Sequence, residues 1–321
     1  MQKSFSALEY ESKRKQTRRD RFLGELERVV PWKELEEVVE PYYPKVEGPG
    51  RPPTGLMRML KTTVAQNCFG LSDEGMEDAI YDSQAIRGFV GVDLSCESAP
   101  DSTTILNFRH LLEEHKLTKA IFDKINEYLT AQGLLLREGT IVDATLIAAP
   151  KSTKNKDNAR DPEMHQSKKG NQWYFGMKAH IGVDMESGLV HTVAATSGNV
   201  SDVTQAHTLL HGDEKHVMGD AGYIGIEKRE ENIDKPGVEW HIAARRSKVK
   251  KVADETVRGA LENLERAKAS IRSKVEHPFH VVKDLFKYRK ARYKGLAKNE
   301  AQLFTLFGLA NLVLARRQLL A

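Results

Sequence analysis

The sequence contains only two cysteines, Cys68 and Cys96, which is too few for a disulfide framework or for a zinc site built on cysteines. Long apolar runs are also missing: the longest, residues 304–315, spans 12 residues, whereas a membrane span needs about 20. The first 19 residues have no apolar core of the kind found in a signal peptide. These absences predict a cytoplasmic protein without a membrane partner.

The chain has 321 residues, of which 40% are hydrophobic and 29% charged. This composition excludes a disordered chain, and the length predicts about two domains. The formal net charge is only +4, from 49 basic and 45 acidic residues, and by itself it indicates no partner.

Charge is distributed unevenly along the chain. Residues 241–300 contain 17 basic residues against seven acidic ones, whereas residues 71–101 contain eight acidic residues against one basic. A basic segment of this kind is typical of a surface that binds nucleic acid, although a solvated helix face would have the same composition. The acidic segment argues against DNA contact there, and residues 1–61 are the better N-terminal candidate for it.

The spacing of apolar residues divides the chain near Gly133. Apolar residues recur at helical spacing throughout residues 21–133, so residues 1–133 are expected to form an all-helical domain. Residues 134–321 predict an α/β domain in which helices cover a mixed sheet, with a long basic helical region over 253–290 and a buried helix over 299–319. Residues 151–172 are expected to be a loop. Strands are expected over residues 140–147, 174–183, 189–196, 215–219 and 238–244.

Two aspartates stand out in the strands. Asp143 lies within an apolar strand, where a carboxylate is unfavourable unless it is paired or binds a metal. Asp220 ends another strand and precedes glycines that allow a tight turn, at the end of the strand where α/β sheets bind ligands. Taken alone, either aspartate fits a satisfied turn or capping residue better than a metal ligand.

A third acid, Glu276, lies in the basic helical region. Arg272, Glu276 and Lys283 are four and seven residues apart, so an unbroken helix would place them on one face, although Pro278 is expected to kink it. A pairing of Arg272 with Glu276 within the helix, and a solvent-facing Lys283, are the alternatives.

Three converging carboxylates would repel one another unless a cation lay between them. Two Mg²⁺ or Mn²⁺ ions suit an all-oxygen site and support in-line attack at a phosphodiester. Asp143, Asp220 and Glu276 are therefore predicted metal ligands.

With these residues placed, nearly the whole chain resembles bacterial insertion-sequence transposases of the DDE type, and most closely the insertion-sequence-five group. The motifs are Ile-Val-Asp-Ala-Thr around Asp143, Gly-Asp-Ala-Gly-Tyr around Asp220 and Val-Glu-His-Pro-Phe around Glu276. Arg272, Glu276 and Lys283 match the R-x3-E-x6-K part of the family signature. The segments 100–104, 176–180 and 292–299 are also similar to this group.

The resemblance implies a ribonuclease-H-like catalytic domain behind a helical domain that serves DNA binding and dimerisation. It also implies a homodimer acting on the double-stranded DNA of paired transposon ends in the bacterial nucleoid, which frees a 3′-hydroxyl that then attacks target DNA. Related transposases have a tyrosine three residues before the motif arginine; Ala269 stands there in this chain, so a hairpin intermediate is left open.

Further residues are expected to contact DNA. Arg272 and Lys283 would hold phosphates near the metals, and Trp173 would stack on an exposed base unless it packs at the start of the next strand. His180 is expected to be structural, and Asp184 and Asp202 to be turn and cap residues. The other predicted contacts are Lys168, Lys169, Lys178, Arg245, Arg246, Arg289 and Arg292.

Two other functions remain compatible with these residues. One is a structure-specific nuclease or ribonuclease H that does not carry out strand transfer. The other is a catalytically idle DNA-binding protein that keeps only the fold.

Overall fold

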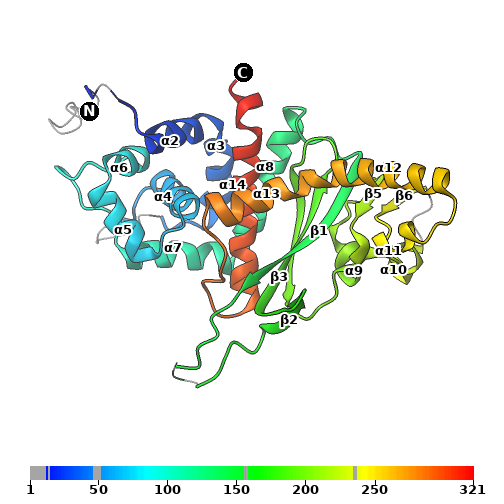
Figure 1. Ribbon diagram of the computed structural model, residues 1–321. Helices are drawn as coiled ribbons and strands as arrows, with labels where there is room; N and C mark the ends of the chain where they lie inside the picture. The colour runs from blue at the N-terminus through cyan, green and yellow to red at the C-terminus, as the bar shows by residue number, and fades with distance from the viewer. Residues whose placement is uncertain (1–11, 14, 46–51, 155, 157, 234–236) are drawn as a thin grey trace.

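A computed structural model describes residues 12–13, 15–45, 52–154, 156, 158–233 and 237–321. Figure 1 shows a cluster of helices from the N-terminal part on one side and a twisted sheet with flanking helices on the other, with the C-terminal helix between them. The fold is mixed α/β behind an N-terminal helical region, consistent with the predicted ribonuclease-H-like class. No helix in the described part of the chain is long and apolar enough to cross a membrane.

The N-terminal region folds as a set of short, capped helices. The Asp101 side chain accepts from the backbone N–H of Thr104 and begins α7, and Gly70 ends α4 with a φ of 65°, which favours glycine. Aspartate and glycine are among the residues preferred at these two cap positions. The helices are α2 (Arg18–Val29), α3 (Trp32–Val39), α4 (Leu56–Phe69), α5 (Asp73–Asp82), α6 (Gln84–Val90), α7 (Ser102–Glu114) and α8 (Leu117–Ala131).

The sheet has the order β2-β3-β1-β5-β6, and β4 also pairs with β3. The β1–β3, β2–β3 and β3–β4 pairs are antiparallel, whereas β5 runs parallel to β1 and β6 parallel to β5. The strands are β1 (Gly139–Ala148), β2 (His165–Lys169), β3 (Gln172–Asp184), β4 (Val190–Ser197), β5 (His216–Gly219) and β6 (Glu239–Ile242).

Successive side chains of β1 point to opposite faces of the sheet, and the two faces pack against different parts of the molecule. Val142 packs with Val217 and Tyr223 in a small core under the segment that follows β4. Ile141 belongs to the main core on the other face, together with Val275 and Phe279 from the C-terminal helical region. Asp143 is two residues beyond Ile141 and so points to this second face.

The C-terminal helix α14 (Leu296–Leu319) packs against both halves of the molecule. It contacts α8, α2 and α4 of the helical region and β4 of the sheet. The buried Asn311 side chain joins them: its amide N–H groups donate to Asn126 on α8 and to the carbonyl of Val190 on β4. One hydrophobic core therefore runs through the helical region and the sheet. The remaining helices are α9 (Asp202–Gln205), α10 (Glu230–Ile233), α11 (Arg246–Lys250), α12 (Glu255–Arg272) and α13 (Glu276–His280).

Two expectations from the sequence are wrong. Residues 151–172 are not all loop, because β2 pairs with the start of β3 to form a hairpin that extends from the sheet. The helical region expected over 253–290 ends early, before Phe286. The break expected near Pro278 is present, because a 3₁₀ turn at Ser273–Val275 and a π turn at Val281–Leu285 flank α13. Pro278, which cannot donate a backbone hydrogen bond, lies between these two irregular turns.

Candidate active site

The three predicted acids line one pocket of about 320 Å³. They come from three elements: Asp143 from the middle of β1, Asp220 from the end of β5 and Glu276 from the start of α13. The pocket walls are mostly polar. The other lining residues are Ala144, Thr145, Leu146, Ser167, Lys168, Lys178, Asp202, Arg272 and Phe279.

The Asp143 carboxylate has the most unusual electrostatic environment of the three. Burial raises its pKa from 3.8 to about 7; the hydrogen bond from the N–H of Ala144 opposes this shift, and the negative charges of Asp220 and Glu276 add to it. The positive charge of Arg272 lowers the pKa only in part. A carboxylate in such surroundings is stabilised as an anion when a cation binds beside it.

Asp220 is fixed by the turn that follows β5. Its Oδ1 accepts from the N–H of Gly222 at 2.8 Å and begins a 3₁₀ turn. A Cβ atom at Gly222 would lie 2.9 Å from that same oxygen, so a side chain at this position would displace the carboxylate. The sequence predicts a tight turn here, and the structure confirms it.

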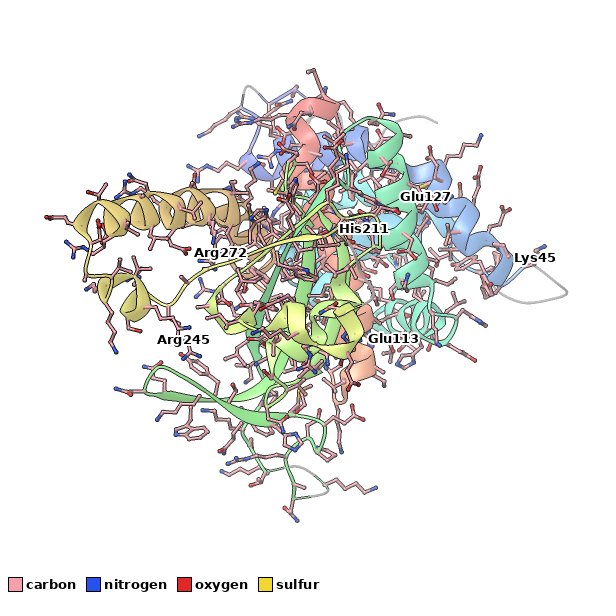
Figure 2. The ribbon with its side chains drawn as sticks, turned by 90° about the vertical axis from the view of Figure 1, so that its right-hand side faces the viewer. Lys45, Glu113, Glu127, His211, Arg245 and Arg272 are labelled. Carbon is pink, nitrogen blue, oxygen red and sulfur yellow. The ribbon has the colours of Figure 1, made fainter. Side chains whose placement is uncertain are left out.

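Glu276 and Arg272 approach the pocket from the sheet-facing side of the C-terminal helical region. Arg272 is the last residue of α12, and one 3₁₀ turn separates it from Glu276. Val275 and Phe279 are buried on either side of Glu276, and they anchor this stretch against the sheet while the Glu276 carboxylate remains exposed. Figure 2 shows Arg272 at the inner end of α12, where the helix meets the sheet.

Lys283 is not the solvent-facing lysine that the spacing left open. Its ammonium donates to the Thr145 hydroxyl at 2.6 Å and to the Leu146 carbonyl at 2.9 Å, two residues of β1 that line the pocket. The π turn around Lys283 changes the helical spacing, so that the side chain points at the strand. Lys283 is therefore held next to the pocket wall close to Asp143.

Asp202 is a fourth carboxylate in the pocket, and the sequence interpretation of it as a cap is wrong. The cap position of α9 is Ser201, and Asp202 instead accepts from Lys178 at 2.8 Å. Lys178 also donates to the Val200 carbonyl and lies along the same pocket. A signal for Asp202 was present in the strand directions: β4 runs parallel to β1, so the residues after β4 reach the same edge of the sheet as Asp220.

Two neighbouring residues are structural, as the sequence predicts. His180 is fully buried, its Nε2 lies 2.7 Å from the Thr196 hydroxyl, and burial lowers its pKa to about 4. Asp184 is buried in the turn after β3, where it accepts from the N–H groups of Arg137, Glu186 and Ser187.

The β2–β3 hairpin carries the predicted aromatic contact. Trp173 is 61% exposed, so it does not pack at the start of the strand, and the Lys168 ammonium lies 5.9 Å from its ring centre. Lys168 reaches the pocket, whereas Trp173 lies outside it. The side chain of Lys169 lies outside the described part of the structure.

The other predicted DNA contacts fall in different places. Arg246 lines a second pocket, of about 450 Å³, which shares Arg272 with the first; the exposed Arg245 precedes α11 beside it (Figure 2). Arg289 is exposed and pairs with Asp284. Arg292 does not reach either pocket: its guanidinium donates to the Leu71 carbonyl and joins the C-terminal segment to the helical region.

The acidic segment 71–101 is largely used for internal contacts. Glu97 forms a bidentate pair with Arg58, Asp73 pairs with Arg109, and Glu77 accepts from the backbone of Ser102. Arg58, an N-terminal candidate for a phosphate contact, is therefore already paired within the molecule.

Comparison with known protein families matches this arrangement. Residues 135–312, more than half of the chain, match the family described as Transposase DDE domain, and residues 11–111 match the family described as Transposase domain (DUF772). The first match contains all four carboxylates of the pocket, Asp202 included, and both basic residues of the signature. The second covers most of the helical region. The assignment to the insertion-sequence-five group stays a prediction. The family itself is established: the chain belongs to the DDE transposases.

Proposed function

We propose that this transposase cleaves phosphodiesters at the terminal inverted repeats of its transposon and joins the freed 3′-hydroxyl to target DNA. Enzymes of this family act on DNA and use divalent metal ions. The observation that carries the proposal is the convergence of Asp143, Asp220 and Glu276 on one pocket that also contains Arg272, Lys168 and Lys178.

The three carboxylates are the groups that would hold the metal, as two Mg²⁺ or Mn²⁺ ions. The donor set fits such ions, because it offers oxygen ligands only. Burial and neighbouring negative charge raise the pKa of Asp143, and a bound cation would lower that pKa again. When bound, such ions activate a water or hydroxyl nucleophile and stabilise the leaving oxygen.

The basic residues of the pocket would position the DNA backbone. Arg272 can hold a phosphate with two parallel hydrogen bonds, and Lys168 adds a point charge from the hairpin. The ion pair with Asp202 holds Lys178 in one place, so its charge reaches the pocket at a fixed position. Lys283 supports the β1 wall beside Asp143 and adds positive charge there.

A path for the DNA strand is suggested by the second pocket. It shares Arg272 with the first and is lined by further basic residues of α11 and α12, Arg246, Lys250 and Arg266. Arg245 lies next to it, and Trp173 on the hairpin would stack on a base beyond the first pocket. We infer that the strand runs between the hairpin and α12, and that two copies of the chain bind paired ends, each through its helical domain of residues 1–133 and its catalytic domain of residues 134–321.

The test is a reaction of the purified protein with Mg²⁺ and a DNA fragment that carries the inverted repeats flanking its gene. We expect nicked ends and then a product joined to target DNA through the donor 3′ end, both lost in Asp143→Asn. The matched control is Asp123→Asn, which removes an exposed carboxylate on α8 that pairs only with Lys119 among the contacts described.

The outcomes separate the competing functions. Cleavage without any joined product would indicate a nuclease that does not carry out strand transfer. If wild-type protein neither cleaved these ends nor bound Mn²⁺ at the three carboxylates, the proposal would be wrong.

A further inference from the structure

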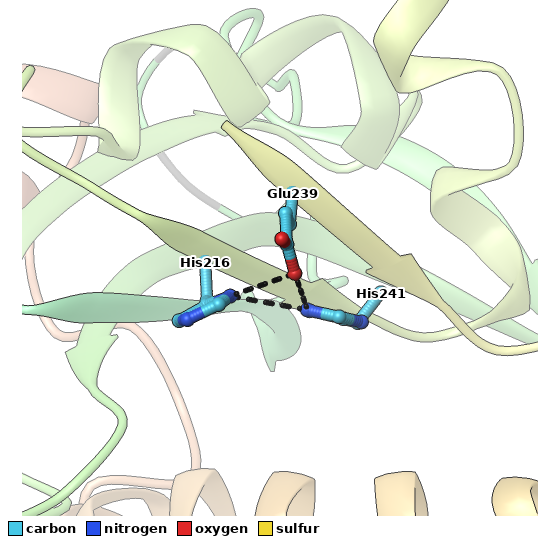
Figure 3. Close-up of side chains that lie close together, drawn as sticks. All are labelled: His216, Glu239 and His241. Carbon is cyan, nitrogen blue, oxygen red and sulfur yellow. Dashed lines mark hydrogen bonds and ion pairs between the residues drawn. The ribbon is translucent and has the colours of Figure 1, made fainter. Parts of the chain in front are cut away.

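A second cluster of metal-binding side chains lies away from the active-site pocket. His216 on β5 and Glu239 and His241 on β6 face one another across the two parallel strands (Figure 3). In the strand register His216 lies opposite Glu239, and His241 is two residues after Glu239 on the same face of β6. Two neighbouring strands thus hold all three side chains, without any contribution from a loop.

The distances between the donor atoms match those of a coordination site. His216 Nδ1 lies 3.4 Å from Glu239 Oε2, His241 Nε2 lies 3.6 Å from the same oxygen, and the two ring nitrogens are 3.3 Å apart. A tetrahedral Zn²⁺ ion with bonds of about 2.0–2.1 Å places its ligands roughly 3.3–3.4 Å from one another. An ion could therefore bind all three atoms with almost no movement of the side chains.

The chemistry of this donor set differs from that of the active site. Two imidazole nitrogens and one carboxylate oxygen suit Zn²⁺ and related transition metals, whereas the all-oxygen pocket suits Mg²⁺. None of the three residues lines that pocket. His216 begins β5 and Asp220 follows its end, so about 13 Å of strand separates the two places.

The cluster is also accessible from solvent. The side chains of His216, Glu239 and His241 are 39%, 68% and 33% exposed, which leaves a route for an ion to enter and a fourth position for water. Glu239 and His241 lie on β6, the last strand of the order β2-β3-β1-β5-β6. An ion bound here would cross-link that terminal strand to its neighbour β5.

We propose that His216, Glu239 and His241 bind one divalent transition-metal ion, with Zn²⁺ as the preferred ion, which joins β6 to β5. The three ligands leave one coordination position to water. This ion is independent of the catalytic metals, and it stabilises the strand that leads into Asp220.

Zinc titration of the full chain in excess Mg²⁺ tests the proposal, with a chelating dye as competitor. We expect one Zn²⁺ site, weakened about 10–100-fold or more in His241→Ala and in Glu239→Gln. His110→Ala is the matched control, because His110 is exposed on α7 and belongs to no three-donor cluster among the described residues. Substitution of Co²⁺ should give the visible absorption of a tetrahedral site in the wild type and in His110→Ala, but not in the two cluster variants.

The unfolding midpoint gives a second, independent readout. Zn²⁺ should raise the unfolding midpoint of the wild type and of His110→Ala, but not of His241→Ala; the exposed Glu239→Gln replaces it if His241→Ala does not fold. Zinc affinity that is unchanged in both cluster variants, or lost in Asp143→Asn instead, would overturn the proposal, because the ion would then bind elsewhere.

Discussion

Asp143 lies on β1, and Asp220 directly follows the end of β5, the strand that runs parallel to β1. Ile141 pairs with Met218, and extending that register by two residues sets the two aspartates side by side. Their carboxylates are therefore positioned by the backbone of the sheet, and each raises the energy of the other when both are charged; the charge on Asp220 indeed raises the pKa of Asp143. Binding of a cation between them removes this repulsion.

Removing either aspartate should abolish catalysis without unfolding the protein. We expect Asp143→Asn and Asp220→Asn each to lower the cleavage rate by about 10³-fold or more, because several kcal/mol of transition-state stabilisation is lost. The double variant should be no worse than either single one, since the two residues act as a unit. Single-turnover cleavage measures this, and additive losses would show that the two carboxylates act independently.

The turn after β5 offers a more specific test. Gly222→Ala introduces a Cβ atom 2.9 Å from Asp220 Oδ1 and should lower cleavage about 10–100-fold, because a small displacement of a catalytic group is enough to cause that loss. Gly259→Ala is the matched control: nothing lies within 4 Å of its Cβ, and it should stabilise α12 by about 0.5–1 kcal/mol. Equal activity of the two variants would mean that Asp220 tolerates movement.

Lys283 should contribute to DNA cleavage, although it lies in an irregular helical turn. Lys283→Ala removes two hydrogen bonds to β1 and a positive charge next to the pocket, so we expect about a 10-fold or greater loss of cleavage with a modest loss of stability. Lys298→Ala, at an exposed position of α14, should behave as wild type. Cleavage rates and unfolding midpoints of both variants, measured side by side, decide the point.

The hairpin residue Trp173 should contribute to DNA affinity alone. Its ring is 61% exposed, so Trp173→Ala should leave the free energy of unfolding unchanged and weaken DNA binding by about 1–3 kcal/mol, the usual contribution of a stacked base. Trp173→Phe should recover much of that affinity. Leu136→Ala, which shortens another exposed apolar side chain, serves as the control. Binding titrations at fixed salt would contradict the prediction if both alanine variants bound equally well.

Acid should destabilise the protein through a buried histidine. His191 bonds to the Thr140 and Thr192 hydroxyls, and burial lowers its pKa from 6.5 to about 3. A folded-state pKa below the unfolded one means that its contribution is complete above pH 6.5 and is lost as the pH falls toward 3, at about 1.4 kcal/mol per pH unit. Urea unfolding at several pH values should show a shallower decline for His191→Gln. An identical slope in wild type and variant would exclude His191 as the source.

Local sequence patterns predicted most of the fold. The apolar strand around Asp143 and the helical spacing of the residues before Gly133 are patterns of neighbouring residues, and the structure confirms both the strand and the helices. The β2 strand was missed because its residues are polar and because, within the described part of the chain, it pairs only with the start of β3. A hairpin of this kind has no apolar alternation to detect, since neither face is covered.

The site was predicted less completely than the fold. The three carboxylates could be found because each interrupts an apolar pattern or lies in a signature spacing. Asp202 and Lys178 could not be paired from the sequence, because 24 residues separate them and only the sheet brings them together. The direction of Lys283 depends on a π turn, which local spacing does not reveal. The cluster of His216, Glu239 and His241 could not be found from the sequence either, because it forms only when β5 and β6 pair.

The position of α14 determines how the molecule must fold. Asn311 donates both to α8 and to β4, and the surrounding apolar residues belong to a core that neither half completes by itself. Helix α14 is thus needed to cover the apolar surfaces of both the helical region and the sheet. A chain truncated before Leu296 would lack this helix and expose the apolar surfaces of both halves, so a single late truncation should disable the helical region and the sheet together.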